Sequence, residues 1–351
     1  MGRYMESGAV VRNISTKSHG VRKALNEVKV ENTTIVCLGG DMTYSANKIE
    51  DLCKSVESVI GLRVDGPQHL STYNDMEVIG FYYGKDNETD KTYCFSEEDR
   101  DAIVQNTLLP LCVDVDGNLL PLEEICKNFS RMIFFTHCHG ATELCKITEK
   151  LHNILLEKGL TNEQAHKIYE QSFHCSYASN CRESYYPTMY VFSLTDGCYP
   201  FLKHVYKEYY GEVLDGVSIK YDPPGKHMTE NISSRDYYKH VHHDSIIVFT
   251  SRLVNKQPNN LLKSVYDEHS YCFLDRDIMN WGFKADGDSV YSPNADLVSK
   301  MVAYAMAINI VASLNTARTG KITKRISILD LKAELENLIN TFDQEDLKIQ
   351  R

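Results

Sequence analysis

RMIFFTHCHGATEL, residues 131–144, joins a short apolar run to a helix-like stretch through the tetrapeptide His-Cys-His-Gly. The apolar residues 132–135 predict a buried strand, and apolar residues on one face of the following segment predict a helix that ends at Gly159. Cys138 therefore lies at a corner between a strand and a helix. A thiol between two imidazoles at such a corner has three explanations: a nucleophile on a sharp turn, a metal ligand, or an inert core cysteine.

The same succession, an apolar strand followed by a turn and a helix, recurs along the chain. Further strands are predicted at residues 33–38, 77–83, 172–177, 189–194 and 245–250. Further helices are predicted at residues 47–60, from Thr161 and from Pro293. Apolar residues are nearly continuous within these strands, which indicates burial on both faces, and the helices between them indicate parallel crossovers. The predicted fold class is α/β, a mostly parallel sheet with helices on both faces.

The chain is expected to divide into three parts. Residues 1–30 are expected to be an N-terminal extension, residues 31–320 the main domain, and residues 321–351 a C-terminal amphipathic helix. The apolar face of that helix is formed by Ile328, Leu331, Leu335, Leu338 and Phe342. This face is expected either to pack on the body of the protein or to pair with a second copy in a homodimer.

Composition and charge argue against several classes of function. The formal net charge is −10 with dispersed acidic residues, which argues against nucleic acid or an anionic membrane as the main partner. No apolar run is long enough for a transmembrane segment, and residues 1–20 lack the apolar core of a secretory signal. The eleven cysteines are odd in number and irregularly spaced. They indicate a reducing compartment: the cytoplasm of the protein's own cell, or that of a host cell if the protein is exported without a signal peptide.

The residues around Cys138 suit a nucleophile elbow, a strand-to-helix turn that needs small residues two positions before and after the nucleophile. Gly140 follows by two positions and Thr136 precedes by two. The helix that begins at Gly140 would direct its free amides and the positive end of its dipole toward the sulfur. That arrangement favours thiolate over thiol.

The metal alternative has suitable residue types but not the spacing. The candidate zinc ligands are His137, Cys138, His139, His174 and Cys175. No CxxC or HExxH pattern accompanies them, and these are the spacings that typify zinc sites. We therefore expect no metal and no cofactor.

Other chemically useful residues follow predicted strands, and open α/β sheets place reactive groups at the carboxyl ends of their strands. Gly39, Gly40 and Asp41 follow the strand at residues 33–38. Asp196 follows the strand at residues 189–194, and His269 comes in the segment after the last predicted strand. A cysteine nucleophile needs a base to manage protons and an acid to orient that base.

The order of these elements resembles the α/β-hydrolase superfamily, in a variant with a cysteine nucleophile, as in dienelactone hydrolases. The resemblance covers roughly residues 30–318 as an order of elements, and the elbow is its one specific motif. It implies a catalytic triad of Cys138 as nucleophile, Asp196 as acid and His269 as base, since the chain order agrees with that of the family. Thr136 departs from the family, which more often has glycine there, and Cys138 replaces the commoner serine.

The resemblance also implies an oxyanion hole. Gly39, Gly40 and Asp41 would contribute one backbone N–H, and the amide of His139 would be the partner donor.

The predicted activity is hydrolysis of an ester, thioester or activated amide through an acyl-enzyme intermediate. The long segments 85–130 and 199–243 are expected to be lid-type insertions, which suggests a large or proteinaceous acyl substrate. The departures from the family leave open a transferase or an inactive fold. The competing function is a non-catalytic α/β scaffold that binds a partner protein.

Overall fold

The computed structural model describes the greater part of the chain. The described residues are 6–14, 20–40, 43, 45–61, 76–84, 94–179, 181, 183–193, 217–222, 244–250 and 293–349. Every structural statement below concerns these residues.

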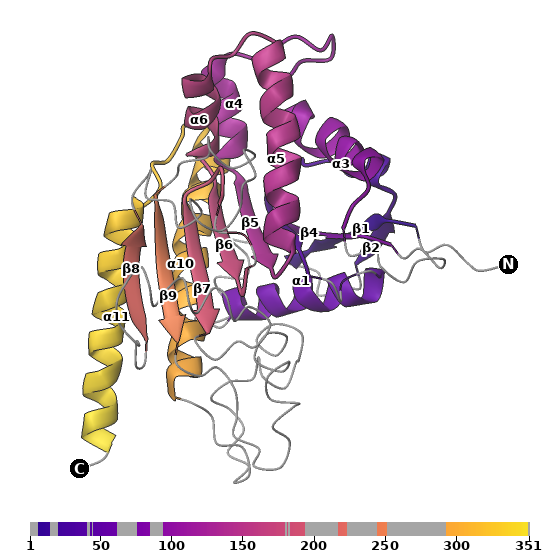
Figure 1. Cartoon of the computed structure of the whole chain (residues 1–351). Helices are drawn as coiled ribbons and strands as arrows, with labels where there is room; N and C mark the ends of the chain where they lie inside the picture. The colour runs from indigo at the N-terminus through magenta and orange to yellow at the C-terminus, as the bar shows by residue number, and fades with distance from the viewer. Residues whose placement is uncertain are drawn as a thin grey trace, which may run out of the picture.

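A nine-stranded sheet in the order β2-β1-β4-β3-β5-β6-β7-β9-β8 forms the centre of the molecule (Figure 1). The strands are β1 Gly8–Asn13, β2 Val21–Lys23, β3 Thr33–Leu38, β4 Met76–Tyr82, β5 Met132–His137, β6 Phe173–Tyr177, β7 Thr188–Ser193, β8 Ser218–Asp222 and β9 Ser245–Thr250. The six strands from β4 to β9 in this order are parallel, and antiparallel strands lie at both edges. The predicted α/β class with a mostly parallel sheet is confirmed.

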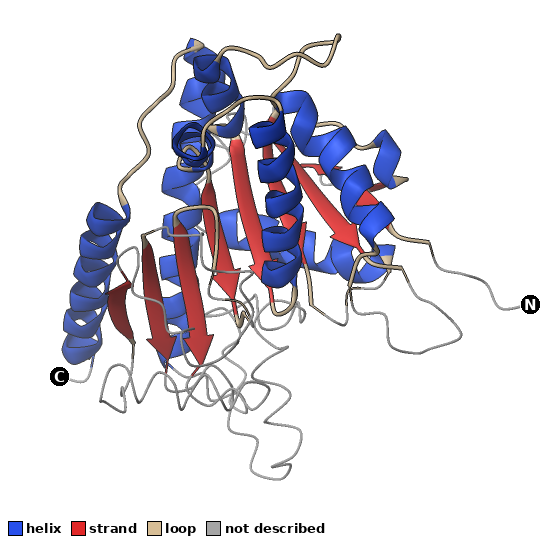
Figure 2. Ribbon diagram, turned by 45° about the horizontal axis from the view of Figure 1, so that its top comes forward, coloured by secondary structure: helices blue, strands red, loops and turns tan. Residues whose placement is uncertain are grey.

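Helices cover both faces of the sheet (Figure 2). They are α1 Ala46–Gly61, α3 Glu97–Ile103, α4 Leu122–Phe129, α5 Gly140–Glu157, α6 Asn162–Tyr169, α10 Pro293–Thr319 and α11 Ile328–Ile349. The apolar residues of α1, α10 and α11 share one core with the sheet, and those of α3 to α6 share the other. β3 and β5 are buried along their whole length, as their continuous apolar sequences predict.

The first thirty residues contribute two strands that the sequence did not predict. β1 pairs with β4 along its full length and with β2 on its other side. Arg12 on β1 is buried, and its guanidinium forms ion pairs with Glu50 at 2.9 Å and Glu57 at 2.6 Å on α1. The described part of residues 1–30 is therefore built into the sheet, whereas the sequence suggested an extension.

The two segments expected as insertions also contribute to the body. Within residues 85–130, α3 and α4 bury Ile103, Ile125 and Phe129 in the same core as α5. Within residues 199–243, the described strand β8 adds an antiparallel edge next to β9.

The C-terminal helix packs on the body of the protein. Leu331 and Leu335 are completely buried, and α11 contacts α10, β8 and β9. From Ile328 to Ile339 the apolar face of α11 is thus filled by the chain's own core, which is the first of the two expectations stated for it. Among the described helices, none is both long and apolar enough to cross a membrane.

Candidate active site

Cys138 occupies the corner between β5 and α5 in a left-handed backbone conformation, with φ of 55°. Such a conformation is uncommon for a residue other than glycine, and strained backbone of this kind is concentrated at functional sites. The corner is held by a hydrogen bond from the Cys138 amide to the Tyr177 carbonyl at the end of β6, at 3.0 Å. Cys138 is 6% exposed. The sharp turn expected from the sequence is present, and the role of Cys138 as a nucleophile stays a prediction.

Gly140 allows α5 to begin immediately after this corner. A Cβ atom at Gly140 would lie 2.2 Å from the Leu38 carbonyl oxygen and 2.9 Å from that of Gly39. Both are backbone atoms at the end of β3, which is the neighbour of β5 in the sheet. The absence of a side chain at Gly140 therefore lets the start of α5 lie directly against β3.

The Gly39-Gly40 loop lies against the Cys138 side chain. A Cβ atom at Gly40 would be 2.5 Å from Cys138 Cβ and 2.9 Å from its Sγ. The loop is fixed by its carbonyls: the Thr43 amide and hydroxyl donate to Gly40 O at 2.9 and 2.5 Å, and the Tyr83 hydroxyl donates to Gly39 O. Gly40 thus lies against the Cys138 side chain, and an oxyanion hole formed by Gly39, Gly40, Asp41 and the His139 amide stays a prediction.

A methyl group at Gly40 should obstruct the sulfur. We expect Gly40→Ala to slow alkylation of Cys138 by iodoacetamide at least about tenfold, because the added Cβ would collide with Cys138 Cβ, which cannot rotate away. The control is Asn153→Ala, at an exposed position of α5. An alkylation rate of Gly40→Ala equal to that of Asn153→Ala would contradict this expectation.

A buried polar layer beneath the corner gives the Thr136 hydroxyl its hydrogen-bond partners. The Thr136 hydroxyl lies 2.8 Å from His174 Nε2 and donates to Ser176 Oγ at 3.1 Å. His174 is completely enclosed, and this burial lowers its pKa to about 3, so the ring is neutral near pH 7. His174 Nδ1 lies 3.1 Å from Ser184 Oγ. The Thr136 hydroxyl is therefore part of a buried hydrogen-bond network.

The zinc alternative gains no support from this layer. Both ring nitrogens of His174 lie within hydrogen-bond distance of hydroxyl groups. In the part of the chain that the structure describes, no three His, Cys, Asp or Glu side chains are grouped so that they could hold a metal ion.

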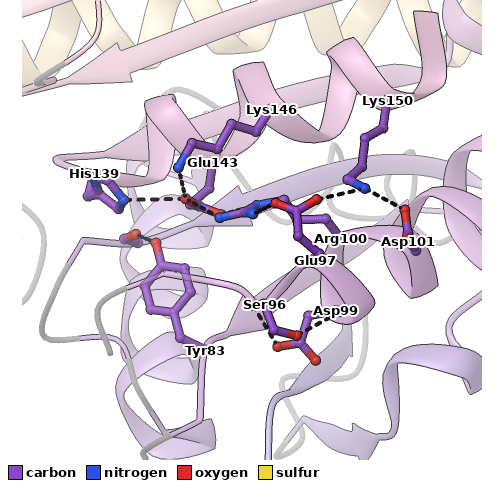
Figure 3. Close-up of polar contacts among 11 residues, drawn as sticks. Tyr83, Ser96, Glu97, Asp99, Arg100, Asp101, His139, Glu143, Lys146 and Lys150 are labelled. Carbon is purple, nitrogen blue, oxygen red and sulfur yellow. Dashed lines mark hydrogen bonds and ion pairs between the residues drawn. The ribbon is translucent and has the colours of Figure 1, made fainter. Parts of the chain in front are cut away.

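Beside the corner, the buried Glu143 carboxylate is contacted by basic side chains from α3 and α5 (Figure 3). Glu143 on α5 has no exposed surface, and Arg100 on α3 donates to both of its oxygens, at 2.9 and 3.2 Å. His139 Nε2 lies 3.3 Å from Glu143 Oε1, and Lys146 Nζ lies 3.2 Å from the same atom. Burial alone would raise the pKa of Glu143, but hydrogen bonds from His139 and Arg100 and the charges of Arg100 and Lys146 lower it to about 2.

Sequence reasoning missed this ion network. Its local signals were weak: His139 and Lys146 lie four and three residues from Glu143 along one helix. Arg100 is 43 residues from Glu143 in sequence, on a segment that was expected to be an insertion, and no local pattern links the two.

The remaining predicted site residues lie outside the described residues. These are Asp41, Asp196 and His269. β7 ends at Ser193 and β9 at Thr250, and both run parallel to β5, so the segments that carry Asp196 and His269 begin at the same edge of the sheet as Cys138. Their placement around the sulfur stays a prediction.

Comparison of the sequence with protein-family models and with curated proteins finds no match.

Proposed function

We propose that this protein is a cysteine-dependent acyl hydrolase with Cys138 as its nucleophile, built on an α/β-hydrolase-like sheet. One observation carries the proposal: a thiol residue at φ of 55° on a strand-to-helix corner, with the glycine loop of the neighbouring strand against its sulfur. A core cysteine needs neither the strained backbone nor the close glycine loop. A nucleophile needs the first to be presented to a substrate and the second to receive an oxyanion.

In the proposed reaction, His269 accepts the proton of the Cys138 thiol as Sγ bonds to the carbonyl carbon of an ester, thioester or activated amide. The negative charge that develops on the carbonyl oxygen is stabilised by backbone N–H groups of the Gly39-Gly40 loop and of His139. The Cys138 amide does not serve, because it donates to Tyr177 O. The bond to the leaving group breaks as His269, oriented by Asp196, protonates that group, and water then releases the acyl group and restores the thiol.

Thiol reactivity provides a direct test of this proposal. We expect limiting iodoacetamide at about pH 6 to alkylate Cys138 at least tenfold faster than Cys94, because Cys138, unlike Cys94, directly precedes the N-cap of the long helix α5 in a left-handed backbone conformation. Cys94 is the matched internal control, since it is half-buried and thus more accessible than the buried Cys138. Peptide mass spectrometry measures the alkylation of both residues in one sample.

The activity itself is tested by screening acyl esters and thioesters against wild type and Cys138→Ala. Hydrolysis that disappears in the variant supports the proposal. Alkylation of Cys138 no faster than that of Cys94, together with no hydrolysis above background in the wild type, would favour the non-catalytic scaffold.

A further inference from the structure

The loop that lies against Cys138 contains two consecutive glycines, Gly39 and Gly40. Glycine has the most freely rotating backbone of all residues, and these two have no side chains by which packing could hold them. The contact still needs a fixed backbone, since a Cβ atom at Gly40 would lie only 2.5 Å from Cys138 Cβ. The orientation of the loop therefore depends on hydrogen bonds to its peptide groups.

The carbonyls of both glycines accept such bonds. Thr43 donates to Gly40 O from its amide at 2.9 Å and from its hydroxyl at 2.5 Å. Thr43 is only three residues further along the chain, so these bonds close a local turn. Tyr83 donates to Gly39 O from elsewhere in the fold: it directly follows β4, the neighbour of β3 in the sheet. Of the two residues, Tyr83 is the one that ties the loop to the body of the protein.

The Tyr83 ring is held in place by the core. Tyr83 is 5% exposed and belongs to the core that the sheet shares with α3 to α6. Its ring makes an edge contact with the buried Phe95, with 4.7 Å between the ring centroids and 64° between the planes. Figure 3 shows the Tyr83 hydroxyl directed at the Gly39 carbonyl. A ring packed in this way is a rigid anchor for that carbonyl.

The bond to Gly39 O also determines the direction of an amide. A trans peptide group is planar, and its carbonyl and N–H point in opposite directions. Gly39 O and the Gly40 N–H belong to the same peptide group, so fixing the first fixes the direction of the second. Gly40 is the glycine whose backbone lies closest to the Cys138 sulfur, and backbone N–H groups at such a position are the usual donors to an oxyanion.

We propose that Tyr83 is a positioning residue of the Cys138 site: its hydroxyl holds the Gly39-Gly40 peptide group in the orientation in which the Gly40 N–H donates to the oxyanion. The inference deepens the proposed function and rests on it. In this role Tyr83 neither contacts the substrate nor transfers a proton. Its hydroxyl should therefore affect the rate of the chemical step and not substrate binding.

The sequence provides a specific probe of this peptide group, because Gly39-Gly40 is the only pair of consecutive glycines in the chain. Cell-free synthesis can supply glycine labelled with ¹³C at the carbonyl and ¹⁵N at the amine. In that protein only the Gly40 nitrogen is bonded to a labelled carbonyl carbon. An HNCO spectrum then contains one cross peak, which reports on Gly39 C=O and the Gly40 N–H together.

Tyr83→Phe removes the hydroxyl and keeps the ring. We expect the Gly39 carbonyl resonance to move upfield, as it does when a carbonyl loses a donor, and the Gly40 N–H to exchange faster with solvent. The matched control is Tyr186→Phe, which removes a buried hydroxyl that lies 2.9 Å from Thr148 Oγ1 in the same core. This control should leave the cross peak in place. A folded Tyr83→Phe protein with the wild-type cross peak would overturn the inference.

Steady-state kinetics with p-nitrophenyl acetate, an activated ester, test the role in catalysis. Tyr83→Phe should lower kcat about tenfold and leave KM unchanged, whereas Tyr186→Phe should change neither. A cross peak that moves in Tyr83→Phe while kcat stays at the wild-type value would also overturn the inference.

Failure of the proposed function would look different. In that case the wild type would show no hydrolysis, and the inference would fall with it even where the cross peak moves. Should Tyr83→Phe not fold, Phe95→Leu decides the matter, because it loosens the Tyr83 ring and should move the cross peak in the same direction. An unchanged cross peak in Phe95→Leu would then overturn the inference.

Discussion

Arg325→Met should lower the free energy of unfolding by about 3 kcal/mol, one of the two largest effects expected in this protein. Arg325 lies between α10 and α11, with a partly exposed stem and an enclosed guanidinium. It donates to the backbone carbonyls of Ser130 at 2.8 Å, Met132 at 3.2 Å and Gln171. These carbonyls lie at the amino ends of β5 and β6, so a single side chain joins the C-terminal helices to the sheet.

Arg325 also donates within the C-terminal segment, to Asn309 Oδ1 at 3.0 Å and Ser313 Oγ at 2.7 Å. Burial lowers the pKa of Arg325 to about 9, which leaves it charged at neutral pH. Methionine would fill much of the space but would leave several enclosed acceptors without a donor, and unsatisfied groups of this kind are costly.

Urea denaturation followed by circular dichroism measures this effect. The matched control is Arg318→Met, which removes an exposed arginine from the end of α10 and should change stability by no more than about 0.5 kcal/mol. A difference between the two variants smaller than about 1 kcal/mol would contradict the expected role of Arg325. Because Arg325 acts at the edge of the sheet opposite Cys138, the folded Arg325→Met protein should retain the preference of iodoacetamide for Cys138.

The parallel strands at the centre of the sheet could be predicted because a strand that is buried on both faces has a nearly continuous run of apolar residues. β3, Thr33–Leu38, and β5, Met132–His137, are buried at every position and consist largely of apolar residues. The edge strands have no such apolar run. β2 spans only Val21–Lys23, none of its residues is buried, and two of the three are charged. Short edge strands of this composition are hard to distinguish from loops.

At the candidate site, too, features that depend on neighbouring residues could be predicted, and contacts between residues far apart in sequence could not. The corner at Cys138 could be predicted because the requirement for small residues at Thr136 and Gly140 is local. The contact of the Thr136 hydroxyl with His174, which is 38 residues away in sequence, has no local signal. The Arg100–Glu143 pair likewise joins α3 to α5 through space. Such pairs are formed by packing, which a single sequence does not reveal.

Gly140→Ala is the second variant for which we expect a large loss, again about 3 kcal/mol in the free energy of unfolding. The new Cβ would lie 2.2 Å from Leu38 O and 2.6 Å from Leu38 C, which are backbone atoms of β3 and cannot rotate away. α5 and β3 would have to separate. The Gly39-Gly40 loop would then move away from the sulfur, so Cys138 should also lose its advantage over Cys94 in alkylation.

The matched control for Gly140→Ala is Asn153→Ala, on the exposed side of the same helix. Alanine is the better helix former, so this control should be neutral or slightly stabilising. Gly40→Ala completes the comparison, because it should slow alkylation while it leaves the contact between α5 and β3 intact. If Gly140→Ala kept both wild-type stability and the alkylation rate of Cys138, the close approach of α5 to β3 could not be what presents the sulfur, and the elbow would lose its structural basis.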